Sequence, residues 1–307
     1  MYDVIIIGGG PAGVGAGVYA ARKKMKTALI AELFGGQSVV SADIQNWIGA
    51  KSISGFDLAK NLEEHLRAQE DIDIVDGERV SNVSKNQNGV FLVRTASKKT
   101  FEGKTVLVAS GSRRKKMNIP GEKEFDGKGV AYCSICDAPI FKDMDVAVVG
   151  GGNAGLETVV DLFPYAKHIY LLHHGEELKG DAVTQEKIFS NKNTRVIFSA
   201  ETKEIYGDKM VTGLAYLDTK SGEEKKLAVQ GVFVEIGILP NSEILGDLVD
   251  LNKFGMVITN PKTQRTSMPG IWAAGDVTDG QYRQNNISAG DAIKAILDIY
   301  DILNIRA

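Results

Sequence analysis

Cysteine is scarce in this sequence, neither sign of charge is in excess, and no apolar run is long. Two cysteines among 307 residues cannot form the disulfide framework of a small secreted domain. The 36 lysines and arginines nearly balance the 39 aspartates and glutamates, so no overall field indicates nucleic acid or an anionic membrane as a partner. The longest apolar runs, such as residues 4–7 and 146–149, are far shorter than the ~18 residues that a membrane span needs.

The N-terminus also lacks the marks of a secretion signal. Met1 leads directly into an apolar strand pattern, without a basic region or a small-residue cleavage site. We therefore expect a soluble, cytoplasmic chain that is long enough for two domains. Both cysteines, Cys133 and Cys136, lie in one C-x-x-C unit, which in a reducing cytoplasm indicates redox or metal chemistry.

Glycine is abundant, and it gathers in two similar clusters. The sequences GGGPAG at 8–13 and GGGNAG at 150–155 both match G-x-G-x-x-G, and each follows an apolar run. We predict helices over 12–23 and 155–163 and second strands over 27–31 and 169–172. This order is that of a βαβ unit, in which the loop and the helix N-terminus hold a dinucleotide pyrophosphate. The candidate loop residues are Gly8, Gly10, Pro11, Ala12 and Gly13 in the first cluster, and Gly150, Gly152, Asn153 and Ala154 in the second.

The second βαβ unit interrupts the domain that the first unit begins. A strand predicted over 104–109 is followed by a basic run at 113–116, where the chain leaves the first domain. It returns after an apolar run at 232–237, and strands over 256–259 and 270–274 and a helix over 287–303 complete the first domain. We predict an α/β protein with two Rossmann-like dinucleotide-binding domains, the second inserted into the first, with boundaries at 1–116 with 243–307 and at 117–242.

The residue that closes each second strand bears on which nucleotide binds. Glu32 lies 19 positions after Gly13, where a carboxylate accepts hydrogen bonds from ribose hydroxyls. The equivalent residues of the second unit are His173 and His174, which are neither the acid typical of NAD sites nor the arginine typical of NADP sites. Asp276 ends another apolar strand, where its carboxylate can bind a polyol hydroxyl.

The C-x-x-C unit has three interpretations: a redox dithiol, half of a zinc site, or a pair of inert buried thiols. His168 and His173 could complete a zinc site, but 31 residues separate Cys136 from His168, against the ~12–15 of a zinc finger. We favour a redox dithiol, with Asp137 able to donate and accept the proton that a thiolate gains or loses. No hydrolase motif offers an alternative, because the sequence contains neither G-x-S-x-G nor H-E-x-x-H.

Together these motifs resemble the low-molecular-weight thioredoxin reductases and the flavoprotein subunit of alkyl hydroperoxide reductase. The resemblance covers nearly the whole chain. Segments 32–37 and 171–181 are closer to the hydroperoxide reductase branch, whose N-terminal dithiol module we expect to be lacking here. Besides the two loops, the matching stretches are GGQ at 35–37, NW at 46–47, IPGE at 119–122, CSICD at 133–137, IGILPN at 236–241, AAGD at 273–276, YRQ at 282–284 and SAG at 288–290.

The resemblance implies FAD in the outer domain and NADH or NADPH in the inserted domain, which carries the dithiol. Electrons would pass from the nicotinamide nucleotide through FAD and Cys133/Cys136 to a thioredoxin-, glutaredoxin- or peroxiredoxin-linked carrier, and the enzyme would be a homodimer. The further FAD residues that it implies are Glu32, Gly36, Gln37, Asn46, Gly111, Asp276, Arg283 and Gln284.

The sequence departs from the family where a 2′-phosphate would bind. The family pattern H-R-R-x-x-x-R reads His173-His174-Gly175-Glu176-Glu177-Leu178-Lys179 here, so both first arginines are lost and only a lysine stands at the last position. A histidine with the reference pKa of ~6.5 is mostly neutral at pH 7. We therefore expect NADH to be used at least as well as NADPH, with NADPH gaining as both histidines become charged toward pH 6.

Two other functions stay open. A ferredoxin-dependent flavin thioredoxin reductase, or a dithiol oxidase, would leave the second glycine loop unused. A redox sensor on the same fold would have no turnover. We expect no metal, nucleic acid or membrane among the partners.

Overall fold

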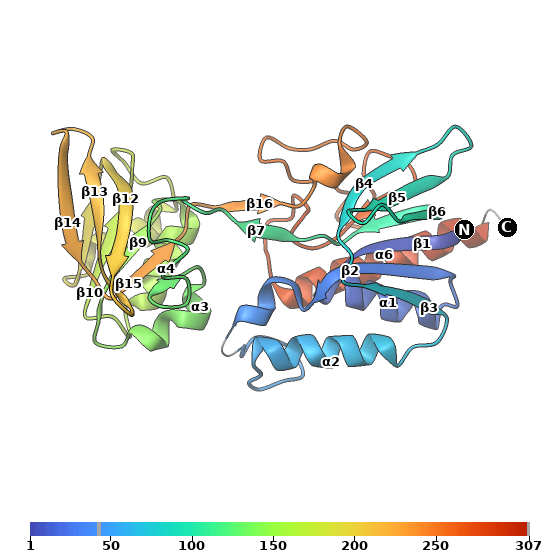
Figure 1. Cartoon of the computed structure of the whole chain (residues 1–307), viewed down its shortest axis with the longest axis horizontal. Helices are drawn as coiled ribbons and strands as arrows, with labels where there is room; N and C mark the ends of the chain where they lie inside the picture. The colour runs from blue at the N-terminus through green and yellow to red at the C-terminus, as the bar shows by residue number, and fades with distance from the viewer. Residues whose placement is uncertain (42–43, 306–307) are drawn as a thin grey trace. The chain divides into compact units, whose positions relative to one another are not determined.

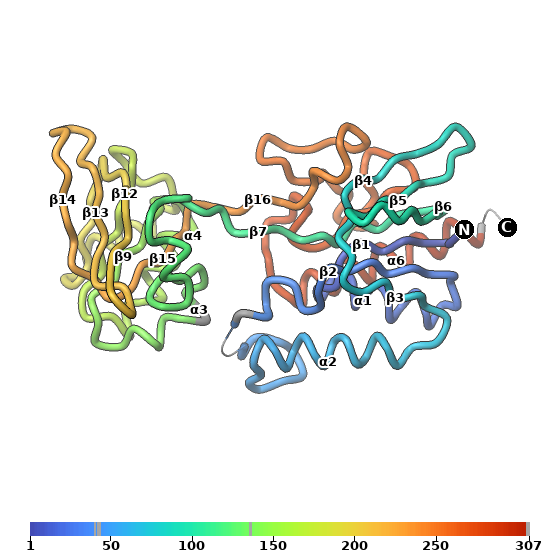
Figure 2. The backbone as a smooth tube through the Cα atoms, viewed as in Figure 1, coloured from blue at the N-terminus to red at the C-terminus, as the bar shows by residue number. Residues whose placement is uncertain are grey.

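The computed structural model describes residues 1–41 and 44–305, without the side chains of residues 40, 135, 136 and 305. Contacts within the chain divide it into two compact units, Met1–Arg113 with Leu239–Ala307 and Arg114–Ile238. The chain leaves the first unit within β7 (Ser112–Arg114) and returns within β16 (Ile238–Pro240), and these two strands pair (Figures 1 and 2). The predicted architecture, one α/β unit inserted into another, is confirmed.

The first unit is built on a mixed sheet whose centre is parallel. Its strand order is β3 (Ile72–Asp76), β2 (Thr27–Phe34), β1 (Tyr2–Gly9), β6 (Thr100–Val108), β5 (Phe91–Thr95) and β4 (Val80–Lys85), and β17 (Ile271–Ala273) also pairs with β6. The apolar residues 4–7 of β1 are buried, as expected for a central strand covered on both faces. Because β1 and β6 pair in parallel, their carboxyl ends lie at the same edge of the sheet.

Three α-helices accompany this sheet. Small residues of α1 (Pro11–Arg22) share a buried cluster with residues of α6 (Asn285–Ile305), so these two helices pack closely. The third, α2 (Gly55–Arg67), begins where the hydroxyl of Ser54 accepts a hydrogen bond from the Asp57 N–H. Two short 3-10 helices, η1 (Gly36–Val40) and η3 (Glu243–Leu245), complete the unit.

The second unit is a parallel sheet with different layers on its two faces. Its order is β11 (Thr194–Ile197), β10 (His168–Leu172), β9 (Asp145–Val149), β15 (Gly231–Val234) and β8 (Val130–Ala131). One apolar cluster joins the sheet to α4 (Asn153–Leu162) and α5 (Ala182–Ser190), near α3 (Ser134–Asp137) and η2 (Ala138–Phe141). Another joins it to the antiparallel sheet of β12 (Ala200–Gly207), β13 (Val211–Asp218) and β14 (Glu223–Ala228).

One strand prediction is wrong. Residues 256–259 form no strand, and Val257 makes only isolated bridges to Leu251 and Thr278. The alternating pattern there reflects one buried side chain, Val257, that packs against the sheet from a loop. Within residues 1–41 and 44–305, no helix is both long enough and apolar enough to cross a bilayer.

Candidate functional site

The first glycine loop connects β1 to α1 with almost no room between backbone segments. Gly8 has a φ of +122°, and a Cβ there would overlap the carbonyl of Ala109. A Cβ at Gly13 would overlap the carbonyl oxygen of Gly8. Gly10 is different, because its nearest neighbour would be the Cα of Gly36 at 3.9 Å. It is the N-cap of α1 and no side chain caps this helix, so the helix presents its first N–H groups to a space that a ligand can enter.

A cavity of about 330 Å³ lies over this loop. It collects residues from the ends of β1, β2 and β6 and from the segment after β17, all within the first unit. The predicted site residues that line it are Gly8, Gly10, Pro11, Ala12, Glu32, Gly36, Gln37, Gly111 and Asp276. Five polar residues that also line it were not among the predicted ones: Ser110, Ser112, Asn241, Asn285 and Ser288.

Polar side chains from distant segments meet in the cavity. Gln37 donates a hydrogen bond from Nε2 to the Ser112 Oγ at 3.0 Å. The hydroxyls of Ser112 and Ser288 each lie 3.5 Å from a carboxylate oxygen of Asp276. Hydroxyl, amide and carboxylate groups of this kind suit the hydroxyls and phosphates of a nucleotide.

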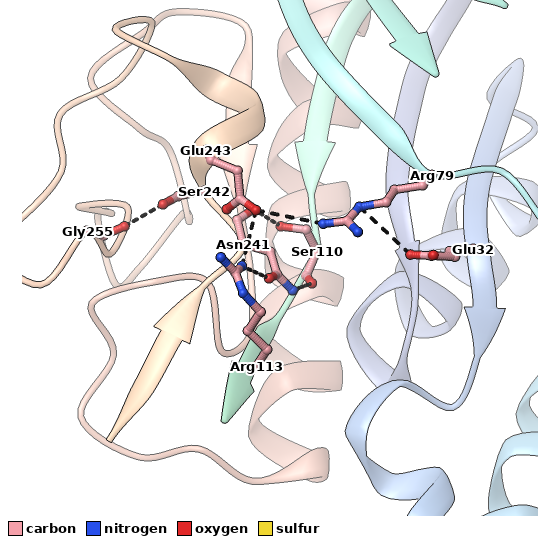
Figure 3. Close-up of polar contacts among 8 residues, drawn as sticks. All are labelled: Glu32, Arg79, Ser110, Arg113, Asn241, Ser242, Glu243 and Gly255. Atoms are coloured by element: carbon pink, nitrogen blue, oxygen red, sulfur yellow. Dashed lines mark hydrogen bonds and ion pairs between the residues drawn. The ribbon is translucent and has the colours of Figure 1, made fainter. Parts of the chain in front are cut away.

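At the end of the cavity marked by Glu32, carboxylates and guanidinium groups alternate (Figure 3). Arg79 lies between Glu32 and Glu243, with N···O distances of 4.0 and 3.9 Å. Arg113 binds the same Glu243 carboxylate at 3.1 Å and also donates to the side chain of Asn241. Because 4.0 Å is longer than a hydrogen bond, Arg79 does not use up the acceptor capacity of Glu32.

Four residues implied for FAD are not among those lining the cavity: Gly13, Asn46, Arg283 and Gln284. Gly13 instead allows the helix to approach β1. Asn46 donates from Nδ2 to the Gln284 Oε1 at 3.0 Å, so these two predicted residues lie together. The Arg283 Nη2 lies 3.1 Å from the sulfur of Met256, while its buried Nε has no protein partner.

The second glycine loop, in the second unit, repeats the geometry of the first. Gly150 has a φ of +132°, and Gly155 packs against it as Gly13 does against Gly8. A Cβ at Gly152 would meet nothing within 4 Å, and this residue is the uncapped N-cap of α4. The next residue, Asn153, accepts a hydrogen bond from the Asp181 N–H at 2.8 Å, and Ala154 follows it in the exposed first turn.

His173 lies beneath this second loop. Its side chain is buried, with the residue 3% exposed, and neither ring nitrogen has a partner among the described residues. The ring packs against Gly151, whose carbonyl accepts a 2.8 Å hydrogen bond from the Lys179 N–H, and its centroid is 4.6 Å from that of His174. Burial, followed by the nearby His174 and Lys179, lowers the pKa of His173. This direction argues against the expectation that His173 becomes charged toward pH 6.

The candidate dithiol is in the same unit as this second loop. Cys133 is disulfide-bonded and is the N-cap of α3. The side chain of Cys136 lies outside the described part of the chain. The Asp137 N–H donates to the Cys133 carbonyl at 3.0 Å, and partial burial raises the pKa of the Asp137 carboxyl. Asp137 therefore holds a proton at a higher pH than an exposed aspartate does.

The zinc interpretation gains no support from the described residues. His168 binds the Asp145 carboxylate through Nδ1 at 2.7 Å. No three histidine, cysteine, aspartate or glutamate side chains in the described ranges group as a metal site.

Comparisons with known proteins agree on one family. The family described as pyridine nucleotide-disulphide oxidoreductase matches residues 2–292. A Bacillus subtilis protein named NADH dehydrogenase is 43% identical over 302 residues, which is 98% of this chain and 58% of the relative. A Pseudomonas aeruginosa subunit of alkyl hydroperoxide reductase is 44% identical over 305 residues, again 98% of this chain and 58% of the relative. The chain thus spans less than two thirds of the length of these relatives.

Solved structures of similar length also match. A thioredoxin reductase from Streptococcus pyogenes has a TM-score of 0.83 at 33% identity, and each chain is covered to 99%. The thioredoxin reductase of T. acidophilum has a TM-score of 0.73 at 35% identity, with the same coverage.

Proposed function

The chain belongs to the pyridine nucleotide-disulphide oxidoreductase family, and from this we propose that it is an NAD(P)H-dependent flavoprotein disulfide reductase. Electrons pass from NADH or NADPH through FAD to the Cys133/Cys136 dithiol and then to a disulfide of a carrier protein. One observation carries the proposal: the same open glycine loop with an uncapped helix occurs in both units, and a disulfide-bonded cysteine lies in the second.

The first unit fits FAD. The open surface at Gly10 and Gly36 and the N-terminus of α1 suit the pyrophosphate. Glu32 is placed to accept hydrogen bonds from the adenosine ribose, and Asp276 to bind hydroxyls of the ribityl chain. Asn46, Arg283 and Gln284 complete the proposed set. FAD supplies a centre that accepts a hydride and passes on two electrons.

The second unit fits the nicotinamide nucleotide. The space over Gly152 and the first turn of α4, with Asn153 and Ala154, suits its pyrophosphate. The unpaired ring nitrogens of His173 lie beneath this loop. Burial lowers the pKa of His173, so this histidine offers less charge to a 2′-phosphate than an exposed one, and the arginines of the family pattern are missing here; we propose that NADH is used at least as well as NADPH.

The dithiol passes electrons on by thiol–disulfide exchange. Reduction of the Cys133/Cys136 disulfide consumes two electrons and two protons and gives two thiols. One thiolate then attacks the carrier disulfide to form a mixed disulfide, and the second thiol releases the reduced carrier. Asp137, with its raised pKa, holds the proton that one thiol must gain or lose.

The partner that we propose is a small dithiol protein of the thioredoxin or glutaredoxin kind, or one linked to a peroxiredoxin. Its support is that the matched relatives include both thioredoxin reductases and longer subunits of alkyl hydroperoxide reductase. The homodimer and the cytoplasmic location remain expectations from the resemblance, and the location agrees with a nucleotide donor that the cytoplasm supplies.

The ferredoxin-dependent or oxidase alternative has less support, because the second glycine loop keeps its open surface and uncapped helix. NADH-dependent reduction of a thioredoxin disulfide tests the proposal directly. We expect turnover by the native chain and none by Cys133→Ser or Cys136→Ser, although both variants retain FAD. Full turnover by either variant, or no turnover with NADH and NADPH but turnover with reduced ferredoxin, would overturn it.

A further inference from the structure

Ser134 stands between the two cysteines in the sequence, and its hydroxyl is hydrogen-bonded to a carboxylate from another helix. Ser134, 8% exposed, donates from Oγ to the Asp161 Oδ2 at 2.7 Å. A hydroxyl–carboxylate bond of this length is charge-assisted and is stronger than a bond between neutral groups. A partly buried hydrogen bond therefore links the dithiol turn to Asp161.

Asp161 connects this turn to the second glycine loop. It lies in the last turn of α4, and the first turn of the same helix follows Gly152. At a rise of ~1.5 Å per residue, the eight steps along the helix from Asn153 to Asp161 span about 12 Å. One rigid helix therefore carries the proposed nucleotide site at its start and the anchor of the dithiol turn at its end.

The surroundings of Asp161 are rich in negative charge. Glu157 precedes it by one helical turn on the same face, and Glu235 is a buried carboxyl group of the same unit on which both charges act. The pKa of Glu235 is raised to about 7, with burial as the largest cause; Arg114 and Thr158 oppose the rise, and the charges of Glu157 and Asp161 add to it. The charge of Asp161 thus acts on a buried carboxyl of this unit.

We propose that Asp161 is a positioning residue for the dithiol: it holds the turn between the cysteines through Ser134, and its charge opposes ionisation of the reduced thiols. This inference rests on the proposed function. A group that disfavours the thiolate destabilises the reduced form, whereas the neutral disulfide is little affected. Asp161 therefore makes the dithiol a stronger electron donor to the carrier.

The dithiol–disulfide equilibrium of the FAD-loaded chain tests this inference. The protein is equilibrated with mixtures of reduced and oxidised dithiothreitol, quenched with acid, and its thiols are labelled and counted. Dithiothreitol gives two electrons and two protons to the protein disulfide and closes to its own cyclic disulfide. We expect Asp161→Asn to shift the equilibrium toward the dithiol about three- to tenfold, where tenfold corresponds to about 30 mV.

Further variants distinguish the effect of losing the Asp161 charge from that of a general loss of structure. Ser134→Ala, which frees the turn from Asp161, should shift the equilibrium in the same direction by less, and Ser134→Thr should restore the native value. Glu186→Gln removes one exposed carboxylate from α5 and should have no effect. The thiolate absorbance of Asp161→Asn should appear at lower pH than that of the native chain.

An equilibrium for Asp161→Asn equal to that of Glu186→Gln would overturn the inference. If Asp161→Asn does not fold, Ser134→Ala decides: an equilibrium unchanged from the native chain would also overturn it. The assay uses no nicotinamide nucleotide, so its outcome is distinct from that of the proposed function. A chain that shows the shift but fails to oxidise NADH would contradict the function alone.

Discussion

The buried carboxyl of Glu235 makes the stability of the protein depend on pH in a predictable direction. Its side chain is 5% exposed, it follows β15, and Arg114 lies 3.3 Å from its carboxylate. Burial is the largest cause that raises its pKa to about 7 from 4.5, and the nearby ion pair with Arg114 only partly offsets this cost. We predict that Glu235→Gln removes a penalty that the native chain suffers at high pH.

The size and sign of this change in the free energy of unfolding follow from proton linkage. Below about pH 4.5 the carboxyl is protonated in both the folded and the unfolded chain, so it adds no penalty. Between about pH 4.5 and 7 only the unfolded chain releases the proton, and stability falls as pH rises. A rise in the pKa from 4.5 to about 7 corresponds to about 3 kcal/mol in the free energy of unfolding. The native chain has lost all of this stability once the pH exceeds the folded-state pKa.

Urea unfolding with excess FAD, at pH 5 and pH 8, measures this penalty. The variant should gain stability over the native chain by up to about 3 kcal/mol more at pH 8 than at pH 5, since glutamine is isosteric and its carbonyl still accepts from Arg114. Glu204→Gln, which changes an exposed carboxyl on β12, is the matched control and should show no such gain. If the free energy of unfolding changed equally with pH in the native chain and in Glu235→Gln, then the buried carboxyl of Glu235 would not be the source of the penalty.

Three further predictions concern the sites. Gly10→Ala and Gly152→Ala should each cost less than about 1 kcal/mol of stability, because both added methyl groups meet open space, yet each should weaken its own nucleotide at least about tenfold. FAD retention by Gly10→Ala and NADH affinity of Gly152→Ala measure this, and native affinities in folded variants would argue against the glycine loops as binding sites. Asp137→Asn should slow disulfide reduction while sparing NADH-dependent flavin reduction, and stopped-flow traces that show equal loss of both would make Asp137 structural. Finally, kcat/KM for NADH should equal or exceed that for NADPH at pH 8, and NADPH should gain less toward pH 6 than two exposed histidines would provide, because burial lowers the pKa of His173. A strong NADPH preference at pH 8 would show that Lys179 or an unforeseen arginine binds the 2′-phosphate.

The sequence predicts the two loops well because their geometry is local. A tight turn between strand and helix requires glycine where φ is positive, as at Gly8 and Gly150. The glycine motif therefore predicts the backbone conformation of the loop by itself. Burial is less local: the sequence gives His173 the pKa of an exposed histidine, but the fold packs the ring against Gly151, and burial lowers that pKa.

Other parts of the site depend on tertiary neighbours. Ser112 and Ser288 come together at Asp276 only because β6 pairs with β17 and α6 starts beside them, and no short pattern encodes that arrangement. The contact between Ser134 and Asp161 is likewise invisible in the sequence, since 26 residues and a whole strand lie between them. The strand predicted over 256–259 failed for a related reason, because one buried valine in a loop imitates a strand pattern.

The proposed electron path runs from a nicotinamide nucleotide through FAD to the dithiol. Anaerobic titration of the FAD-loaded chain with NADH, followed by flavin absorbance and by counting thiols after an acid quench, measures both steps of this path. We expect NADH to bleach the flavin and two thiols per chain to appear, whereas Cys133→Ser should show the bleaching but no increase in thiols. Bleaching by dithionite alone, with no thiols released by NADH or NADPH, would rule this path out.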